Sequence, residues 1–554
     1  MTIKIVNKKT YVIYTCLCLI FISLFASCGS EAPVISSINP RIGKMGEVIT
    51  LTGYNFGQSR DESYVTIAGI SPTNSSYHSW NKNEIVVRVP ELGESGLVYV
   101  HVRGKKSNGV LFSNSASVPR SIDGEDFGLE PRISSISPQS GTPGSVITLT
   151  GNNFGVSREN AGVFFSWDFE SGAMNPFIVR EPEFIEVSEI EMGYESWSSR
   201  EIRIRLPDGA VSGNIEVRTP HGRSRPVFFD VTGRPGSKTF KDKRIYTITY
   251  SVDIRVNEST RPNTLYLWIP IPVNSPSQRN VRLISRNIEP FLENHRGVSL
   301  YKLNNLTSGT NHSVNLSFRL EVYAVESNVR SQAIRQESTP LSALHTQSTA
   351  LIPGNDQQII NTVNSIIGRE QNPHVRARLI YNWIISNMQI TKNLPSLNDP
   401  VAALEQRQAD PYTSALLYTA MLRAAGVPCI PIAGVIIDQN GNTIRHYWAE
   451  FWIDGLGWLP VDPSMGAGVI FADGQEPENE ELERLAAFYF GNIDNQRIAF
   501  SRGDISLSQL ESRGRVVSHS QSYSLQNIWE EAVGGLESYS SLWGDITISG
   551  IYIQ

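Results

Sequence analysis

The chain has 554 residues, of which 40% are hydrophobic and 18% charged, the composition of an ordinary globular protein of three to five domains. Its net charge of −6 leaves no basic excess, so the composition gives no support for nucleic-acid binding. The 43 Gly and 30 Pro residues favour a β-rich chain with many turns.

The first 27 residues are predicted to be a targeting segment that takes no part in the fold. A start with three lysines precedes an apolar run over residues 11–25, and small residues then lead to Cys28. This pattern resembles a bacterial lipoprotein signal peptide, which implies cleavage before Cys28 and lipidation of its thiol. Several acyl chains would hold the protein at a membrane, so we expect a cell-envelope protein, lipid-anchored to the outer membrane or a periplasmic face. A plain transmembrane anchor is the alternative, although the run is short for one.

Cysteine usage limits the chemistry of the mature chain. Cys16 and Cys18 leave with the signal and Cys28 would carry lipid, so Cys429 is the remaining thiol. No intrachain disulfide and no cysteine metal cluster can then form within the folded domains. The nine histidines show no metal-binding spacing, and we expect neither a metal nor a cofactor.

An internal repeat occupies the first part of the mature chain. Residues 35–40 and 46–57 recur as residues 133–138 and 144–155, both at an offset of 98. Residues 80–90 match residues 197–207 at an offset of 117, so the second copy contains 19 additional residues. They lie in an acidic, aromatic stretch around residues 165–191, which we predict to be a longer loop or hairpin.

Both copies alternate apolar and polar residues between Gly and Pro turns, which predicts short, half-buried strands of a β-sandwich. The shared motif resembles the IPT/TIG immunoglobulin-like family. The resemblance implies two small sandwiches, over residues 28–118 and 131–232, that serve as spacers or interaction modules.

Residues 239–330 are predicted to form a further β domain, because residues 246–256 and 314–323 alternate as strands do. Helical patterns follow at residues 375–388 and 413–425, the second ending at a Gly-Val-Pro stop signal. Strand patterns then resume at residues 430–437 and 446–453.

Three segments of this region resemble the transglutaminase-like family. They are residues 404–428 for its nucleophile helix, 446–452 for its His-x-Trp-x-Glu strand and 457–464 for its Gly-Trp…Asp-Pro end. The predicted fold is therefore multidomain. A mainly β N-terminal part, with two Ig-like sandwiches and a further β domain, precedes an α+β transglutaminase/papain-like domain over residues 350–554.

The resemblance implies that a thiolate attacks an amide carbonyl, that His446 holds the proton and that Asp462 orients His446. Aligned without gaps, however, the cysteine position falls on Pro411, which has no nucleophile. Asp410, one residue earlier, is no nucleophile for acyl transfer either. Asp410 and Pro411 are best interpreted as the N-cap and first residue of a helix.

Other residues could replace the thiol, and we keep them as alternatives. Cys429 begins a predicted buried strand, where a thiol usually behaves as a small hydrophobe. Thr413 and Ser414 lie about one helical turn beyond the expected point, and Asp410 could act with His446 through water.

We expect a membrane-anchored lipoprotein whose degenerate transglutaminase-like domain binds a peptide or glycan in a groove lined by Asp410, Trp448 and Trp458. One alternative is an active amide hydrolase or acyl transferase that uses a displaced nucleophile. Another is an adhesin or scaffold in which the Ig-like pair binds the ligand.

Overall fold

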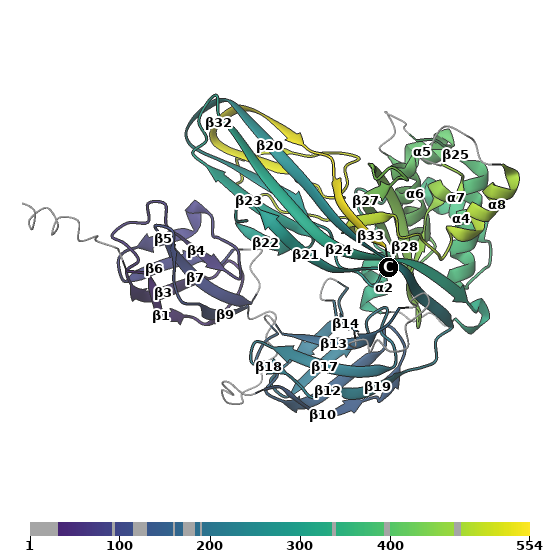
Figure 1. The fold of residues 1–554 in the computed structure, drawn as a ribbon, viewed down its shortest axis with the longest axis horizontal. Helices are drawn as coiled ribbons and strands as arrows, with labels where there is room; N and C mark the ends of the chain where they lie inside the picture. Colours follow the sequence, from purple (N-terminus) through teal and green to yellow (C-terminus); the bar gives the residue numbers. More distant parts are fainter. Residues whose placement is uncertain are drawn as a thin grey trace, which may run out of the picture. The chain divides into compact units, whose positions relative to one another are not determined.

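The computed structural model describes residues 31–90, 95–114, 130–158, 161–169, 183–188, 191–334, 339–392, 399–469 and 478–553. Its internal contacts divide the chain into two compact units, residues 1–115 and 116–554 (Figure 1). Cys28, the linker between the two repeats and much of the inserted stretch lie outside the described residues, so the predictions made for them stay predictions.

The first unit contains one Ig-like sandwich. Its two sheets have the strand orders β1-β3-β6-β5 and β2-β9-β7-β4, and β8 pairs with β7. Alternate residues such as Ile49, Leu51, Val98 and Val100 are fully buried between the sheets, as the period-two pattern predicts. The elements are β1 (Val34–Asn39), β2 (Ile42–Gly43), β3 (Val48–Tyr54), β4 (Tyr64–Ile67), the 3-10 turn η1 (Asn74–Ser76), β5 (Tyr77–Trp80), β6 (Glu84–Arg88), β7 (Gly96–Val102), β8 (Lys105–Lys106) and β9 (Val110–Asn114).

The second copy repeats this sandwich with orders β10-β12-β16-β15 and β11-β19-β17-β13-β14, and β18 pairs with β17. Its additional residues supply β14, which pairs antiparallel with β13. In the first copy, the corresponding strand β4 instead ends in a tight turn closed by a bridge between Ile67 and Ile70. The strands are β10 (Arg132–Ser137), β11 (Ser140–Gly141), β12 (Val146–Asn152), β13 (Gly162–Trp167), β14 (Glu183–Glu186), β15 (Tyr194–Trp197), β16 (Glu201–Arg205), β17 (Gly213–Thr219), β18 (Gly222–Arg223) and β19 (Val227–Val231).

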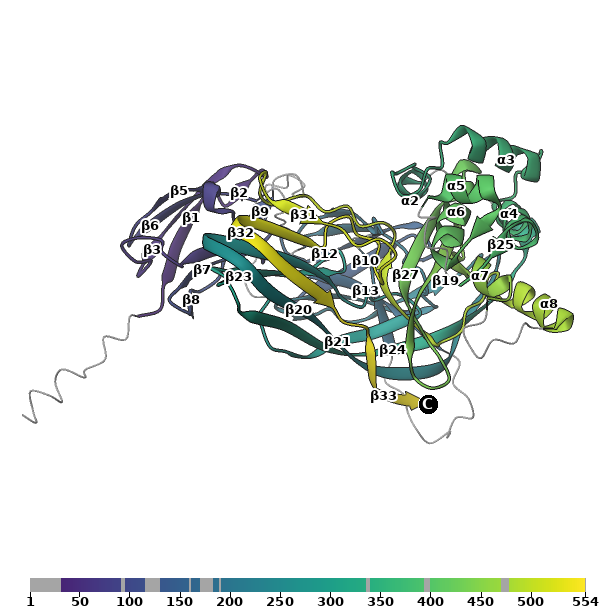
Figure 2. The ribbon, with the colours of Figure 1, turned by 90° about the horizontal axis from the view of Figure 1, so that it is seen from above.

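The following β domain is organised around one strand of 35 residues, β20. One edge of β20 pairs with β24, and its other edge pairs with β33 and then β32 along its length. Figures 1 and 2 show these yellow C-terminal strands beside the teal β20. The C-terminal strands thus complete the sheet of the β domain, whereas the prediction from the sequence assigned them to the transglutaminase-like core. The elements are β20 (Gly236–Pro270), β21 (Gln278–Arg286), β22 (Leu292–His295), β23 (Val298–Asn304), β24 (Asn311–Val329), the 3-10 turn η2 (Ser331–Ala333), β31 (Arg515–Val517), β32 (Glu530–Trp543) and β33 (Thr547–Ile553).

The core combines a four-stranded sheet of order β29-β28-β27-β30 with a group of helices. The helices predicted at residues 375–388 and 413–425 are confirmed as α4 and α6. Helix α6 lies against β27 and β28, and because it is apolar on all sides, residues 411–423 are all buried. The elements are α2 (Pro340–His345), α3 (Gln357–Ile367), α4 (Pro373–Asn387), β25 (Gln389–Ile390), α5 (Pro400–Gln406), β26 (Gln408–Ala409), α6 (Pro411–Ala424), β27 (Cys429–Ile437), β28 (Thr443–Ile453), β29 (Gly457–Val461), α7 (Pro463–Gly466), α8 (Asn479–Phe488) and β30 (Arg497–Arg502).

Several core helices begin in the same way, with proline at the first position after a capping Asn or Asp. The caps of α4, α5, α6 and α7 are Asn372, Asp399, Asp410 and Asp462, and each side chain accepts a backbone N–H of its helix. Proline fits there because the first N–H of a helix has no intrahelical acceptor. Two of the residues singled out from the sequence are therefore helix caps.

Candidate functional site

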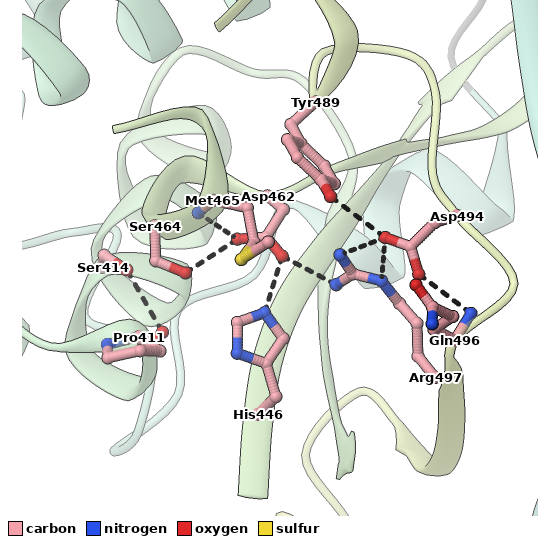
Figure 3. Close-up of polar contacts among 10 residues, drawn as sticks. All are labelled: Pro411, Ser414, His446, Asp462, Ser464, Met465, Tyr489, Asp494, Gln496 and Arg497. Carbon is pink, nitrogen blue, oxygen red and sulfur yellow. Dashed lines mark hydrogen bonds and ion pairs between the residues drawn. The ribbon is translucent and has the colours of Figure 1, made fainter. Parts of the chain in front are cut away.

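His446 and Asp462 meet at one edge of the core sheet. Strands β28 and β29 pair so that Ala449 faces Val461, which sets Asp462, the next residue, beside the part of β28 that carries His446. His446 Nε2 lies 2.6 Å from Asp462 Oδ2, and both side chains are 0% exposed (Figure 3). The structure thus joins these two predicted residues in a histidine–carboxylate pair that is sealed from solvent.

Asp462 has further donors besides His446. Its Oδ1 accepts the Ser464 hydroxyl at 2.8 Å and the Met465 backbone N–H at 3.0 Å. Its Oδ2 also accepts Arg497 Nη1 at 2.7 Å. Burial opposes the charge of this carboxylate, but its interactions with His446 and Arg497 outweigh that effect and hold the pKa of Asp462 well below its usual range.

Arg497 is the residue of this site that the sequence did not reveal. It is 3% exposed, and its guanidinium also pairs with Asp494 at 2.8 Å, whose carboxylate accepts the Tyr489 hydroxyl at 3.2 Å. Arg497 begins β30, 35 residues after Asp462, and no local motif links the two. In a catalytic pair the carboxylate stabilises an imidazolium. In this protein the Arg497 guanidinium already compensates the charge of the Asp462 carboxylate, which weakens the stabilisation that the carboxylate could give to an imidazolium.

The expected nucleophile position is occupied by Pro411, the first residue of α6. Figure 3 shows the second ring nitrogen of His446 turned toward Pro411 and Ser414 at this end of the helix. The Ser414 hydroxyl donates to the Pro411 carbonyl at 3.1 Å. The Thr413 hydroxyl donates to Asp410 at 2.7 Å. Both hydroxyls are therefore committed to the first turn of their own helix.

Cys429 lies too far away to serve His446. In the β27–β28 pairing, His446 faces Gly434 and Cys429 faces Phe451. Five residues of strand separate Cys429 from Gly434, roughly 17 Å at the usual rise. The thiol is fully buried, which raises its pKa to about 12. Cys429 therefore has the position and environment of a core residue.

The residues expected to line a groove do not form one. Trp448 stacks on His446 with ring centroids 6.2 Å apart, and Trp448 and Trp458 are only 5% and 3% exposed. The cavity beside them measures about 40 Å³, far below the usual size of a ligand site. Asp410, 3% exposed, uses its carboxylate to cap α6 and to accept Gln521. The open groove predicted from the sequence is wrong, because this face of β28 packs against the β domain and the second Ig-like domain.

A larger cavity of about 280 Å³ lies where the second Ig-like domain contacts the core. Its walls include Thr142, Glu191 and Arg205 from the Ig-like side and Trp452 and Asp454 from the core. It does not reach His446.

Within the described ranges, no three His, Cys, Asp or Glu side chains gather in a way that could hold a metal ion. None of the helices described there has the length and apolarity to cross a membrane.

The comparisons agree with this architecture. Residues 360–463 match the family model of the transglutaminase-like superfamily, and residues 33–117 and 131–167 match that of the IPT/TIG domain. The chain therefore carries IPT/TIG domains followed by a domain of the transglutaminase-like superfamily.

Individual relatives are distant. An uncharacterized protein of Haemophilus influenzae is 22% identical over 302 residues, which cover 47% of this chain and 79% of that protein. A candidate cysteine protease from Cytophaga hutchinsonii is similar in structure, with 13% identity and a TM-score of 0.36 over 57% of this chain and 93% of that chain. A surface glycan-binding protein from Prevotella bryantii is similar with 10% identity and a TM-score of 0.15, over 53% of this chain and 92% of that chain. At such TM-scores, no property of those proteins transfers to this chain.

Proposed function

We propose that the transglutaminase-like domain of this chain no longer performs acyl transfer and that the protein binds its ligand without modifying it. The observation that carries the proposal is a proline at the first position of α6, beside a histidine–carboxylate pair that is fully buried. Acyl transfer needs a nucleophile that can reach both the substrate and the base. A proline ring supplies none.

The nearby hydroxyl and thiol groups support the same conclusion. Ser414 and Thr413 donate within the first turn of α6, and Ser464 donates to Asp462. Cys429 is distant and has a raised pKa. What remains is a set of hydrogen bonds and ion pairs that joins β28, α7 and β30, which is a structural role.

Turnover measurements test this proposal. The full chain is incubated with an amine donor and a glutamine acceptor, and separately with peptides and with peptidoglycan, alongside His446→Ala. The control is His221→Ala, an exposed histidine of the second Ig-like domain. We expect no turnover in any of the three proteins. Turnover that is present in wild type and His221→Ala but absent in His446→Ala would overturn the proposal.

We place ligand binding on the first Ig-like domain and infer a glycan as the ligand, because that domain exposes an aromatic face. Tyr64 of β4 is 40% exposed and stacks on His101 of β7 with ring centroids 4.5 Å apart and an interplanar angle of 6°. Lys106 Nζ lies 3.6 Å from the ring centroid of the neighbouring Tyr99. Flat rings flanked by hydrogen-bonding groups suit a sugar ring, which has an apolar face and a polar edge.

Among its described residues, the second copy has no counterpart of the Tyr64–His101 stack. Register alignment places Gly162 and Arg218 where the first copy has Tyr64 and His101. Titration calorimetry with neutral oligosaccharides and peptidoglycan fragments tests the site. We expect Tyr64→Ala to weaken binding at least tenfold, while Tyr54→Ala, an exposed tyrosine of the other sheet, leaves it unchanged. Equal binding by the two variants would show that the aromatic face is not the binding site. Binding of extended peptides alone would show that the ligand is not a glycan.

We also propose that the protein is held in the cell envelope by lipid on Cys28, at the outer membrane or a periplasmic face. The support is the sequence pattern before Cys28. Cells grown with an alkyne fatty acid should label the wild type and not Cys28→Ala, and the variant should leave the membrane fraction. Equal labelling of both proteins would contradict the anchor.

A further inference from the structure

Strand β28 has two faces of different character. Tyr447, Ala449 and Phe451 belong to the core shared with α6. The alternate residues point the other way and, with one residue of β29, form what we call the tryptophan face: Trp448, Glu450, Trp452 and Trp458. The second Ig-like domain lies on this face.

Charged and backbone contacts join the Ig-like domain to the core there. Arg502 of β30 pairs with Glu450 at 2.6 Å and also with Glu191 of the Ig-like domain. Asp208 of the Ig-like domain pairs with Lys238 and accepts the Trp458 backbone N–H at 3.1 Å. The Pro143 carbonyl accepts the Gly455 N–H at 3.3 Å.

The apolar part of the contact comes from the elements that distinguish the second copy from the first. Trp167, at the end of β13, is 3% exposed, and its ring centroid lies 5.4 Å from that of Phe240 and 5.1 Å from that of Tyr323. Arg279 lies over the Trp167 ring at 3.9 Å and donates to the Phe184 carbonyl of β14 at 2.6 Å. The first copy has a tight turn at the end of its corresponding strand β4. The additional residues of the second copy therefore build its docking element.

The contact has an apolar and a polar part. Trp167 shares one buried apolar cluster with Trp448, Trp452 and Trp458. Ion pairs and hydrogen bonds supply the polar part, and the cavity of about 280 Å³ lies inside the contact. The link between the Ig-like domain and β20 is short, and Gly233 within it has a φ of 70°, a conformation that glycine adopts readily. Polar interfaces between domains of one chain commonly permit relative movement.

We propose that the second Ig-like domain is a hinged cover on the tryptophan face, latched by Trp167 and β14, which opens about Gly233 while the core stays folded. This proposal concerns movement, and it holds or fails independently of the binding and turnover experiments above.

Hydrogen exchange of the full chain, followed by mass spectrometry, measures the opening directly. The amides of Gly455 and Trp458 donate across the interface, so exchange of a peptide spanning residues 454–459 reports the cover, whereas residues 443–453 report the sheet. In the wild type we expect residues 454–459 to exchange faster than residues 443–453. Trp167→Ala should accelerate residues 454–459 at least tenfold and leave residues 443–453 unchanged. Arg203→Ala, which removes an exposed ion pair within the Ig-like domain, should change neither.

A disulfide provides the opposite perturbation. A Cβ atom at Gly455 would lie 3.5 Å from Thr142 Cβ, which matches disulfide geometry. In the oxidised Thr142→Cys/Gly455→Cys protein, the Trp458 amide should exchange more slowly than in the same protein when reduced. Both forms carry the same substitution at Gly455, so any backbone strain there is the same in the two measurements. If Trp167→Ala does not fold, Glu191→Ala replaces it, with an expected acceleration of a few fold. The proposal is overturned if the release variant leaves residues 454–459 as protected as in the wild type, if it accelerates both segments equally, or if oxidation has no effect.

Discussion

Removing the guanidinium of Arg497 should strongly destabilise the transglutaminase-like core. Arg497 is 3% exposed and Asp462 is 0% exposed, so Arg497→Ala leaves Asp462 buried without its guanidinium partner, and Asp494 loses the same partner. Breaking a buried ion pair from one side typically costs about 3–5 kcal/mol. Asp462 keeps hydrogen bonds from His446, Ser464 and Met465, so we expect a loss near the lower end, about 3 kcal/mol.

Urea unfolding followed by tryptophan fluorescence provides the assay, because several tryptophans lie in the core and the β domain. The matched control is Arg484→Ala, which removes an exposed ion pair with Glu481. The side chain of Arg484 is 66% exposed and that of Glu481 is 38% exposed. Because solvent screens that pair, its loss should change the free energy of unfolding far less. If Arg497→Ala loses no more stability than Arg484→Ala, the inference that the guanidinium compensates buried carboxylates is incorrect.

Three further outcomes are expected. Because the pKa of Asp462 is depressed in the folded protein, its contribution to stability should be complete at pH values above the pKa that Asp462 has in the unfolded chain. This contribution should fall as the pH drops from about 5. Free energies of unfolding measured at stepped pH should therefore decline less steeply in Asp462→Asn than in the wild type. With its pKa raised to about 12, Cys429 should have a thiolate fraction on the order of 10⁻⁵ at pH 7.5. Iodoacetamide should therefore label Cys429 only to the extent that urea unfolds the protein. Rapid labelling of the folded protein would contradict this. Finally, Pro411→Cys should gain no acyl-transfer activity over Pro411→Ala, because the histidine pair is buried and its carboxylate compensated; measurable turnover in Pro411→Cys alone would show that only the thiol is missing.

Features encoded locally could be predicted from the sequence. The alternation at residues 48–52 gives β3 because a strand repeats every two residues and one face is buried. The Asp410–Pro411 pair gives the start of α6 because a cap and a first-position proline act within one helical turn. The closeness of His446 and Asp462 followed from two strand motifs separated by a short turn.

Features that depend on distant residues could not. The pairing of β20 with β33 joins residues near 245 to residues near 552, and nothing in either segment specifies the other. The same holds for Arg497 and its ion pair with Asp462. The groove prediction failed for a related reason, since the exposure of Trp448 and Trp458 depends on domains that precede them by more than a hundred residues. The alternation along β28 predicts two faces and does not say which of them water reaches.

The length of β20 has a mechanical consequence. Tension that enters the β domain through residue 236 runs along the axis of this strand, which pairs with β24 and β23 and also with β32 and β33. Ladder bonds that lie across the pulling direction share the load and must yield together, whereas a hairpin pulled open at one end loses them in succession. A pull along β20 that its partner strands oppose at their far ends therefore loads both ladders at once.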